Sequence, residues 1–266
     1  MNELTELTAA VIAALKSPEI IKSIYGDLLK PGVKQVGMAV ERILKLPNIA
    51  LWHIDRLEGH VNIALEANLE AYREEMSKVS EDKVVEVRPE LGVPVMEKMS
   101  YVGDSELSRL YVALLTSASN LDTSDAAHPA FVNVINCLSP DEARLLQAFA
   151  RKGRHPFVEG QFSNTEGSIV VIPFLVLDEL IGSLALKQNL APYLSNLEGL
   201  GIIRVSNDKW MTGPGHYEAL EAVFLNSGAT PPPGYALNAQ KGLIEVTPYG
   251  HLFLRGCKVV ERQQAG

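Results

Sequence analysis

Three groups of ionisable side chains have types and spacing that could support chemistry. Asp122, Asp125 and His128 lie within one short segment, and two carboxylates with an imidazole form a donor set that binds divalent metals. The same residue types are common in turns, and His128 directly precedes Pro129, so a loop that enters a helix is the alternative. We favour the loop, because this spacing arises easily by chance. We therefore predict neither a metal site nor a cofactor.

The second group is the adjacent pair Asp141 and Glu142, which could work as general acid and base. The pair follows Ser139 and Pro140, however, and this order is typical of a helix start. A capping serine, a proline in the first helical position and a glutamate three residues after the cap together predict a capping box. We therefore interpret both carboxylates as structural.

The remaining candidates are too scattered to predict an active site. His155, His216 and His251 are widely separated, and no Gly-x-Ser-x-Gly, Walker A or Gly-x-Gly-x-x-Gly motif is present. Cys137 and Cys257 are far apart and belong to no C-x-x-C pair, which argues against a disulfide framework or a zinc site. The sequence thus predicts a protein that is not an enzyme, with no evident small-molecule substrate.

Composition narrows the class of protein further. The chain has 266 residues, 47% of them hydrophobic, and a formal net charge of −8, which argues against broad nucleic-acid binding. The N-terminus lacks a basic region, and Pro173 and the pair Asp178-Glu179 interrupt the longest apolar stretch, at 169–186. We therefore expect neither a signal peptide nor a transmembrane helix, and a cytoplasmic location.

Apolar periodicity predicts a mainly α fold in three regions. Residues 1–80 form an N-terminal helical region, and residues 81–168 form a middle helical domain, irregular over 80–100 and loop-like over 151–168. Residues 169–262 form a third, α+β module.

The third region has a distinctive order of elements. Pro192 opens a helix that ends at Gly201, and a strand follows at 202–205. After a long insertion at 206–241, a second strand at 242–247 leads into a helix capped by Thr247. This order is similar to that of a winged helix, although the insertion is much longer than a usual wing.

A winged helix raises the possibility of DNA binding. Ser195 and Asn196 would lie on the exposed side of the reading helix, where asparagine can pair with adenine, and Lys209 and Lys241 are the basic residues nearby. From residue 191 onward, however, six basic residues face six acidic ones, whereas DNA-binding modules normally carry a basic surplus. Protein–protein contact or a structural role is therefore favoured, and DNA binding is the alternative.

The N-terminal helices raise another possibility. Between Lys30 and Arg56 there are five basic residues against two acidic ones, and Trp52 could anchor at a membrane interface. Lys34, Arg42, Lys45 and Trp52 are therefore candidates for contact with a membrane surface or a partner helix. The alternative, which we favour, is that these stripes are ordinary core faces of a helical domain.

Several short motifs together resemble the abortive-infection alpha family. They span most of residues 20–260 and include Ile24 to Pro31, Lys34 to Gly37, Gly92-Val93-Pro94, Tyr101, Glu106-Leu107, Leu114-Leu115, His128 to Val132, Leu138 to Ala143, Val246 to Gly250, Phe253 and Cys257. The resemblance implies a role in bacterial phage defence and brings no catalytic residues. We expect a non-enzymatic component that acts through a protein partner or self-association, the alternatives being a DNA-binding regulator and a membrane-acting effector.

Overall fold

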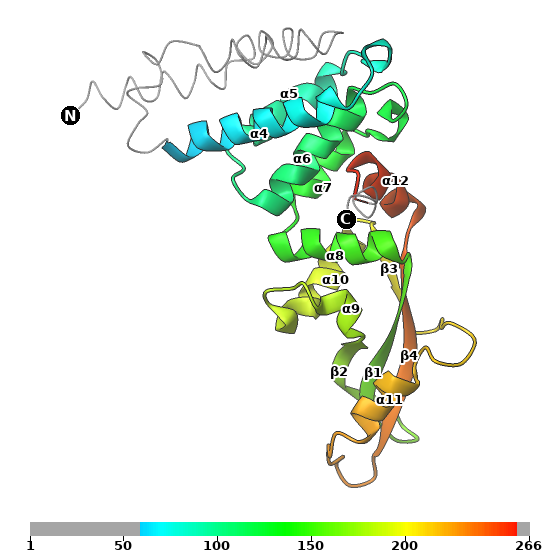
Figure 1. Cartoon of the computed structure of the whole chain (residues 1–266). Coiled ribbons are helices and arrows are strands. Elements are labelled where there is room, and N and C mark those ends of the chain that lie inside the picture. The colour runs from blue at the N-terminus through cyan, green and yellow to red at the C-terminus, as the bar shows by residue number, and fades with distance from the viewer. Residues whose placement is uncertain (1–58, 260–266) are drawn as a thin grey trace, which may run out of the picture. The chain divides into compact units, whose positions relative to one another are not determined.

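The computed structural model describes residues 59–259, which divide into two compact units. The first contains residues 59–138 together with 255–259, and the second contains residues 139–254. About half of the described chain is helical, and its strands form a single four-stranded sheet (Figure 1). The candidates Lys34, Arg42, Lys45 and Trp52 lie outside the described residues.

The first unit is helical. Its elements are α4 (Gly59–Ser77), η2 (Glu81–Lys83), α5 (Pro89–Met99), α6 (Ser105–Ala118), η3 (Ser124–Ala126) and α7 (Ala130–Asn136). Asp104 caps α6 as predicted, because its carboxylate accepts hydrogen bonds from the amides of Glu106 and Leu107. The α6 helix packs against α4, α5 and α7, and their buried faces form the core of this unit.

The α5 helix occupies a segment for which the sequence predicts irregular structure. Gly92 and Pro94 both lie inside the helix, which either residue normally disfavours. Leu91, Val95 and Met99 recur every fourth residue and are almost completely buried. Burial of this apolar stripe therefore outweighs the poor local helix propensity, and the prediction is wrong here.

The second unit combines helices with the sheet. In chain order it contains α8 (Pro140–Arg151), β1 (Arg154–Ser163), β2 (Ser168–Val176), α9 (Asp178–Ile181), η4 (Lys187–Asn189), α10 (Leu190–Gly199), β3 (Ile203–Ser206), α11 (Glu218–Leu225), β4 (Ala236–Val246) and α12 (Pro248–Gly256). The end of α12 carries the chain back into the first unit. The α11 helix, which the sequence analysis missed, packs on β1 and β4.

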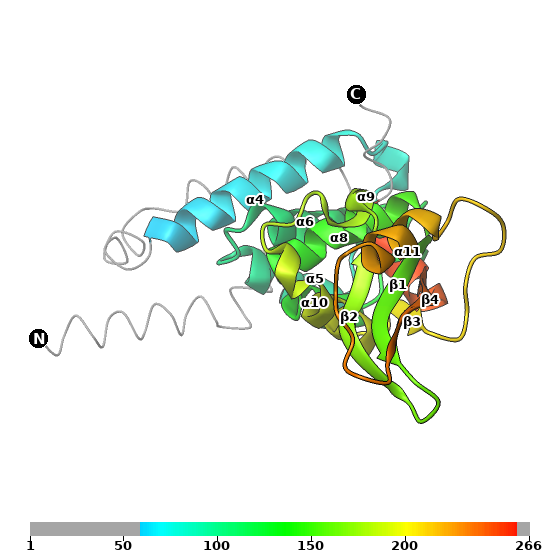
Figure 2. The same cartoon turned by 90° about the horizontal axis from the view of Figure 1, so that it is seen from below.

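All strand pairs in the sheet are antiparallel, in the order β2-β1-β4-β3. The β2 strand therefore lies at one border, as Figure 2 shows from below. The long pairing of β1 with β4 runs from Arg154 opposite Glu245 to Ser163 opposite Ala236.

The prediction of a loop over residues 151–168 is wrong. Pro156 and Gly160 suggested a loop, yet both lie in β1. Pro156 is tolerated near the start of the strand, where pairing with β2 has not yet begun. Gly160 is required because an added Cβ would lie 2.6 Å from the ring of Phe224 on α11. Tertiary contact, which a local pattern does not reveal, thus explains the glycine.

The structure also divides the chain at other places than the predicted boundaries. The position 80/81 lies inside the first unit, and 168/169 falls at the start of β2, within the β1–β2 hairpin. The observed division follows Leu138.

Two predicted helix ends are confirmed. Ser139 and Glu142 form the capping box of α8. Gly201, after α10, has φ +75°. The amide of Gly201 donates to the carbonyl of Glu198, and the amide of Ile202 donates to the carbonyl of Leu197. This is a Schellman ending. The α10 helix starts at Leu190, however, two residues before the predicted Pro192.

Candidate interaction surface

The β2 strand is apolar from Ile169 to Val176 and yet largely exposed. Its sequence from Ser168 to Val176 contains no charged residue. Ile169, Val170 and Val171 are 47%, 49% and 42% exposed. Because successive side chains of a strand point to opposite faces, three exposed neighbours mean that neither face of this half of β2 is covered. The described chain therefore presents an uncharged strand with both its edge and its side chains open.

The hairpin that carries β2 is well defined. In the turn, the Asn164 side chain accepts hydrogen bonds from the amides of Glu166 and Gly167, at 2.8 and 2.9 Å. Irregular pairing near Gly160 alters the register between β1 and β2. Toward its end β2 joins the core, since Leu175 packs against the buried cluster of Val158, Tyr217 and Leu220. Exposure is thus greatest in the turn-proximal half of the strand, and Pro173 is the one exposed residue beyond it within β2.

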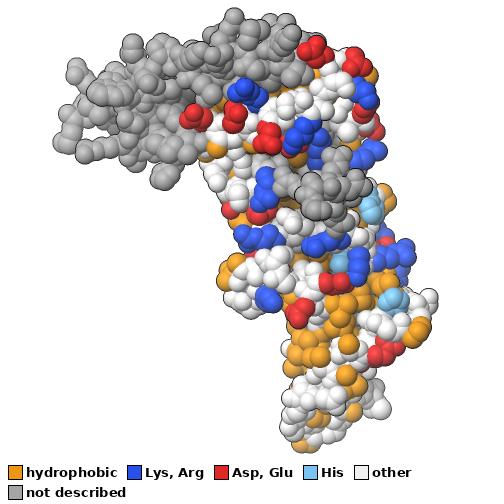
Figure 3. All heavy atoms as spheres, in the orientation of Figure 1, with side chains coloured by type: hydrophobic (Ala, Val, Ile, Leu, Met, Phe, Trp, Pro, Cys, Tyr) orange, Lys and Arg blue, Asp and Glu red, His pale blue; other side chains and the backbone are white. Residues whose placement is uncertain are grey.

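Further exposed apolar side chains lie on α11 and in the segment after β3. Val223 is 60% and Leu225 is 47% exposed, and Trp210 is 54% exposed in the segment after β3. In Figure 3, hydrophobic side chains gather over the stretch where Figure 1 draws β1, β2 and α11. Contiguous apolar surface of this kind is typical of a site that contacts another macromolecule.

The α11 helix is held to the sheet by Tyr217 and Lys241. The Tyr217 hydroxyl donates to the carbonyl of Gly242 at 3.0 Å and accepts from the amide of Met211 at 2.8 Å. The Lys241 ammonium lies 3.3 Å from a carboxylate oxygen of Glu221 and 5.3 Å from the ring centre of Tyr217. Lys241, a candidate DNA contact, therefore has partners within its own unit.

Asp141 is a buried structural centre of the second unit. Its carboxylate accepts from the amides of Ala185 and Leu186, both at 2.9 Å, and from Arg144 and Tyr193 at 2.6 and 3.2 Å. Burial alone would raise the pKa of Asp141, but these hydrogen bonds outweigh it and lower the pKa below its ordinary value. The anion thus ties α8 to the segment before η4 and to α10.

Glu142 has a comparable role. One carboxylate oxygen accepts from the Ser139 amide at 2.6 Å, and the other accepts from the side-chain amide of Asn196 at 2.7 Å. Both carboxylates are only 4% exposed and are fully engaged with protein donors. The prediction that Asp141 and Glu142 serve structure agrees with these contacts, which extend well beyond the helix cap.

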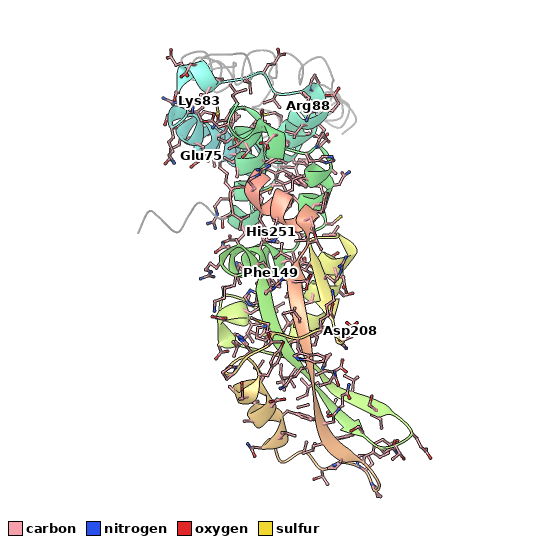
Figure 4. All side chains as sticks on the ribbon, turned by 90° about the vertical axis from the view of Figure 1, so that its right-hand side faces the viewer. Glu75, Lys83, Arg88, Phe149, Asp208 and His251 are labelled. Carbon is pink, nitrogen blue, oxygen red and sulfur yellow. The ribbon has the colours of Figure 1, made fainter. Side chains whose placement is uncertain are left out.

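The four candidate DNA contacts do not form one surface cluster of free polar groups. Asn196 faces α8 through Glu142, and Lys241 faces α11. Ser195 and Lys209 are exposed on α10 and after β3. Lys209 follows Asp208, which Figure 4 labels beyond the end of β3. The Glu198 carboxylate, on the same helix as Asn196, accepts from the amide of Val205.

The residues weighed as metal ligands have separate partners in the first unit. Asp122 pairs with Lys83 at 2.5 Å and Asp125 with Arg255 at 2.8 Å, while Nδ1 of His128 accepts from the amide of Ala130 at 3.1 Å. Within residues 59–259, no three His, Cys, Asp or Glu side chains are placed to hold a metal ion. Each of the three side chains thus has its own partner, and the partners of Asp122 and Asp125 lie 39 and 130 positions away in the sequence.

The three histidines lie on different elements. His155 is buried in β1, where Nε2 lies 3.3 Å from the carbonyl oxygen of Ala148 and the ring packs edge-on against Phe149. Burial lowers the pKa of His155 below its ordinary value. His216 precedes α11, and His251 lies on α12 (Figure 4). His155 therefore belongs to the packing between α8 and β1.

Comparison with known proteins places the chain in a family. A family model described as abortive infection alpha matches residues 64–257, which is more than half of the chain. The chain belongs to the abortive infection alpha family. No curated protein and no solved structure matches the chain at a comparable level. The match includes every element from α5 to α12 and therefore both units.

Sequence reasoning missed the main feature of this family member, the exposed strand β2. The apolar stretch that begins at Ile169 contains β2, although apolarity normally indicates burial. The available signal was Pro173, since proline inside a strand favours a sheet edge. A separate finding concerns membranes: no helix within residues 59–259 is long and apolar enough to span one.

Proposed function

We propose that this chain takes part in abortive infection as a non-enzymatic component that acts through protein–protein contact. Membership of the family supports the setting, in which an infected bacterium stops phage spread. The observation that carries the contact mechanism is β2, an uncharged edge strand whose turn-proximal half is open to solvent. An unpaired apolar edge is a template for another strand, and proteins normally protect such edges when they serve no purpose.

The second unit is, in this proposal, a winged-helix-like frame used for protein contact. The succession α8, β1, α9, α10, β3 and β4 supports the likeness, with β2 and α11 as additions. The partners of Asn196 and Lys241 favour protein contact over DNA reading, because these side chains hold the unit together. DNA binding remains an outcome that the experiment distinguishes.

The test compares phage plaque formation and host survival in bacteria that carry the wild-type chain or a β2 variant. Val171→Lys places a charge on the exposed edge strand, and Leu121→Lys is the matched control at a position that is 60% exposed in the first unit. We expect Val171→Lys to abolish protection while Leu121→Lys retains it, with both proteins unfolding at the wild-type temperature.

Other results would contradict this proposal. Full protection by Val171→Lys would show that β2 is not the contact. Salt-dependent retention of the wild-type chain on duplex DNA, lost in a Ser195→Glu and Lys209→Glu double variant together with protection, would favour the DNA-binding regulator instead.

A further inference from the structure

The two borders of the sheet are very different. One border is β3, which has four residues, and the other is β2, which has nine. On its inner side β2 pairs with β1 from Ser168 to Val176. On its outer side, no strand of the described chain pairs with it. β2 therefore offers the longer stretch of open edge. On the other side of the described sheet, β4 lacks a strand partner from Ala236 to Gly242, and that stretch carries the charge of Lys241.

The exposed part of this edge suits a strand better than a helix. Ile169, Val170 and Val171 are exposed in succession, so apolar side chains project on both faces beside the open edge. A helix would cover one face only, whereas an added strand continues the sheet and places cross-strand neighbours beside side chains on both faces. Pro173 has no amide hydrogen to offer and marks where such pairing would end.

We propose that the strand added to β2 is β2 of a second copy, antiparallel and related by a two-fold axis near Val170. In this register Ile169 pairs with Val171, Val170 with itself, and Ser168 with Ile172. The central pairs are β-branched, the type that stabilises neighbouring strands. This inference rests on the contact function proposed above and names its partner.

Charge is the reason to prefer a second copy. An isologous contact places identical segments against each other, so any charge on the strand would meet a like charge near the axis. Residues 167–177 carry none. The nearest charge, Glu166, would lie opposite Phe174 of the second copy, and the two Glu166 carboxylates would be roughly 27 Å apart at about 3.4 Å per residue. A partner that carries charge would find no counter-charge on β2.

The experiment measures the mass of the purified full-length chain in solution. The wild type is expected to give twice the monomer mass of 29.0 kDa. Val170→Lys and Val170→Glu are each expected to be monomeric, because like charges meet at the axis. An equimolar mixture of the two variants is expected to recover the dimer, because lysine then faces glutamate. Leu121→Lys, the control in the first unit, is expected to stay dimeric.

A cross-link tests the register. In a Cys137→Ser background, which removes the exposed native thiol, Val170→Cys is expected to form a disulfide-linked dimer on mild oxidation. Leu121→Cys in the same background is expected to remain monomeric in a denaturing gel.

Two results would overturn the inference. One is a wild type that is monomeric or polydisperse at all concentrations. The other is a dimer that persists unchanged in Val170→Lys. These results leave the contact function standing if Val171→Lys still loses protection in infected cells, because that contact would then involve a different protein. If Val171→Lys instead protects infected cells as well as the wild type does, the proposed contact function itself is wrong.

Discussion

The side-chain amide of Asn196 on α10 donates a 2.7 Å hydrogen bond to a carboxylate oxygen of Glu142 on α8. These residues are 54 positions apart in the sequence, where Asn196 is a candidate for reading bases and Glu142 is interpreted as structural. Their contact directs both side chains to the packing of the second unit.

Asn196→Ala is therefore expected to lower the free energy of unfolding by about 1 kcal/mol, because the buried Glu142 carboxylate loses a donor. Urea denaturation measures this change. Ser195→Ala, at the exposed neighbouring position, is the control and should change it by less than about 0.5 kcal/mol. Unchanged stability in Asn196→Ala combined with weaker retention on duplex DNA would support base reading instead.

Acidification is expected to destabilise the second unit in two steps. Burial holds the pKa of His155 below 6.5, so the unfolded chain takes up a proton that the folded protein resists. The contribution of neutral His155 to the free energy of unfolding is fully present above pH 6.5. It is lost as the pH falls from 6.5 through the folded-state pKa. The pKa of Asp141 is lowered from 3.8, so its contribution is present above pH 3.8 and is lost below it.

Urea midpoints measured from about pH 7 to about pH 3 separate the two steps. His155→Gln should flatten the upper part of the profile and leave the lower part unchanged. Asp141→Asn should lower stability at neutral pH and flatten the acidic part. If the loss of stability at higher pH persists in His155→Gln, it arises from the titration of another group.

The Ser117 hydroxyl in α6 is buried, and no partner for it is found within the described residues. Ser117→Ala is accordingly expected to raise the free energy of unfolding by about 1 kcal/mol, because a buried hydroxyl without a hydrogen bond is costly. The matched control is Thr116→Val. The Thr116 hydroxyl donates to the Val112 carbonyl at 2.8 Å, so its removal should lower the free energy of unfolding. The unfolding temperature should rise for Ser117→Ala and fall for Thr116→Val. A lower unfolding temperature for Ser117→Ala would indicate that its hydroxyl has a hydrogen-bond partner.

Gly250 on α12 lies so close to Ile202, the residue before β3, that an added Cβ would collide with its carbonyl oxygen. Backbone cannot yield as a flexible side chain does, so Gly250→Ala is expected to destabilise the second unit by about 2 kcal/mol or more. Gly199, near the end of α10, has open space around its Cβ position. Gly199→Ala should therefore be neutral or stabilising, by up to about 1 kcal/mol. Equal effects of the two substitutions would show that packing at Gly250 is not the cause.

The sequence by itself determined the features that depend on neighbouring residues. The capping box at Ser139, the cap at Asp104, the left-handed Gly201 and the helix start after Thr247 all follow from local hydrogen bonding and backbone conformation. Such preferences act over a few residues, so a single sequence reveals them. The family motifs, which include several of these positions, likewise indicated the family correctly.

Tertiary structure decided the rest. It made a helix of α5 despite Gly92 and Pro94, and a strand of β1 despite Gly160, because burial against distant residues outweighs local propensity. It also turned Asn196 inward and left Ile169, Val170 and Val171 exposed. The order of strands in the sheet places β2 at the border, and that order depends on contacts between segments far apart in the chain. No local pattern contains this information, which is why the candidate interaction surface emerged only from the fold.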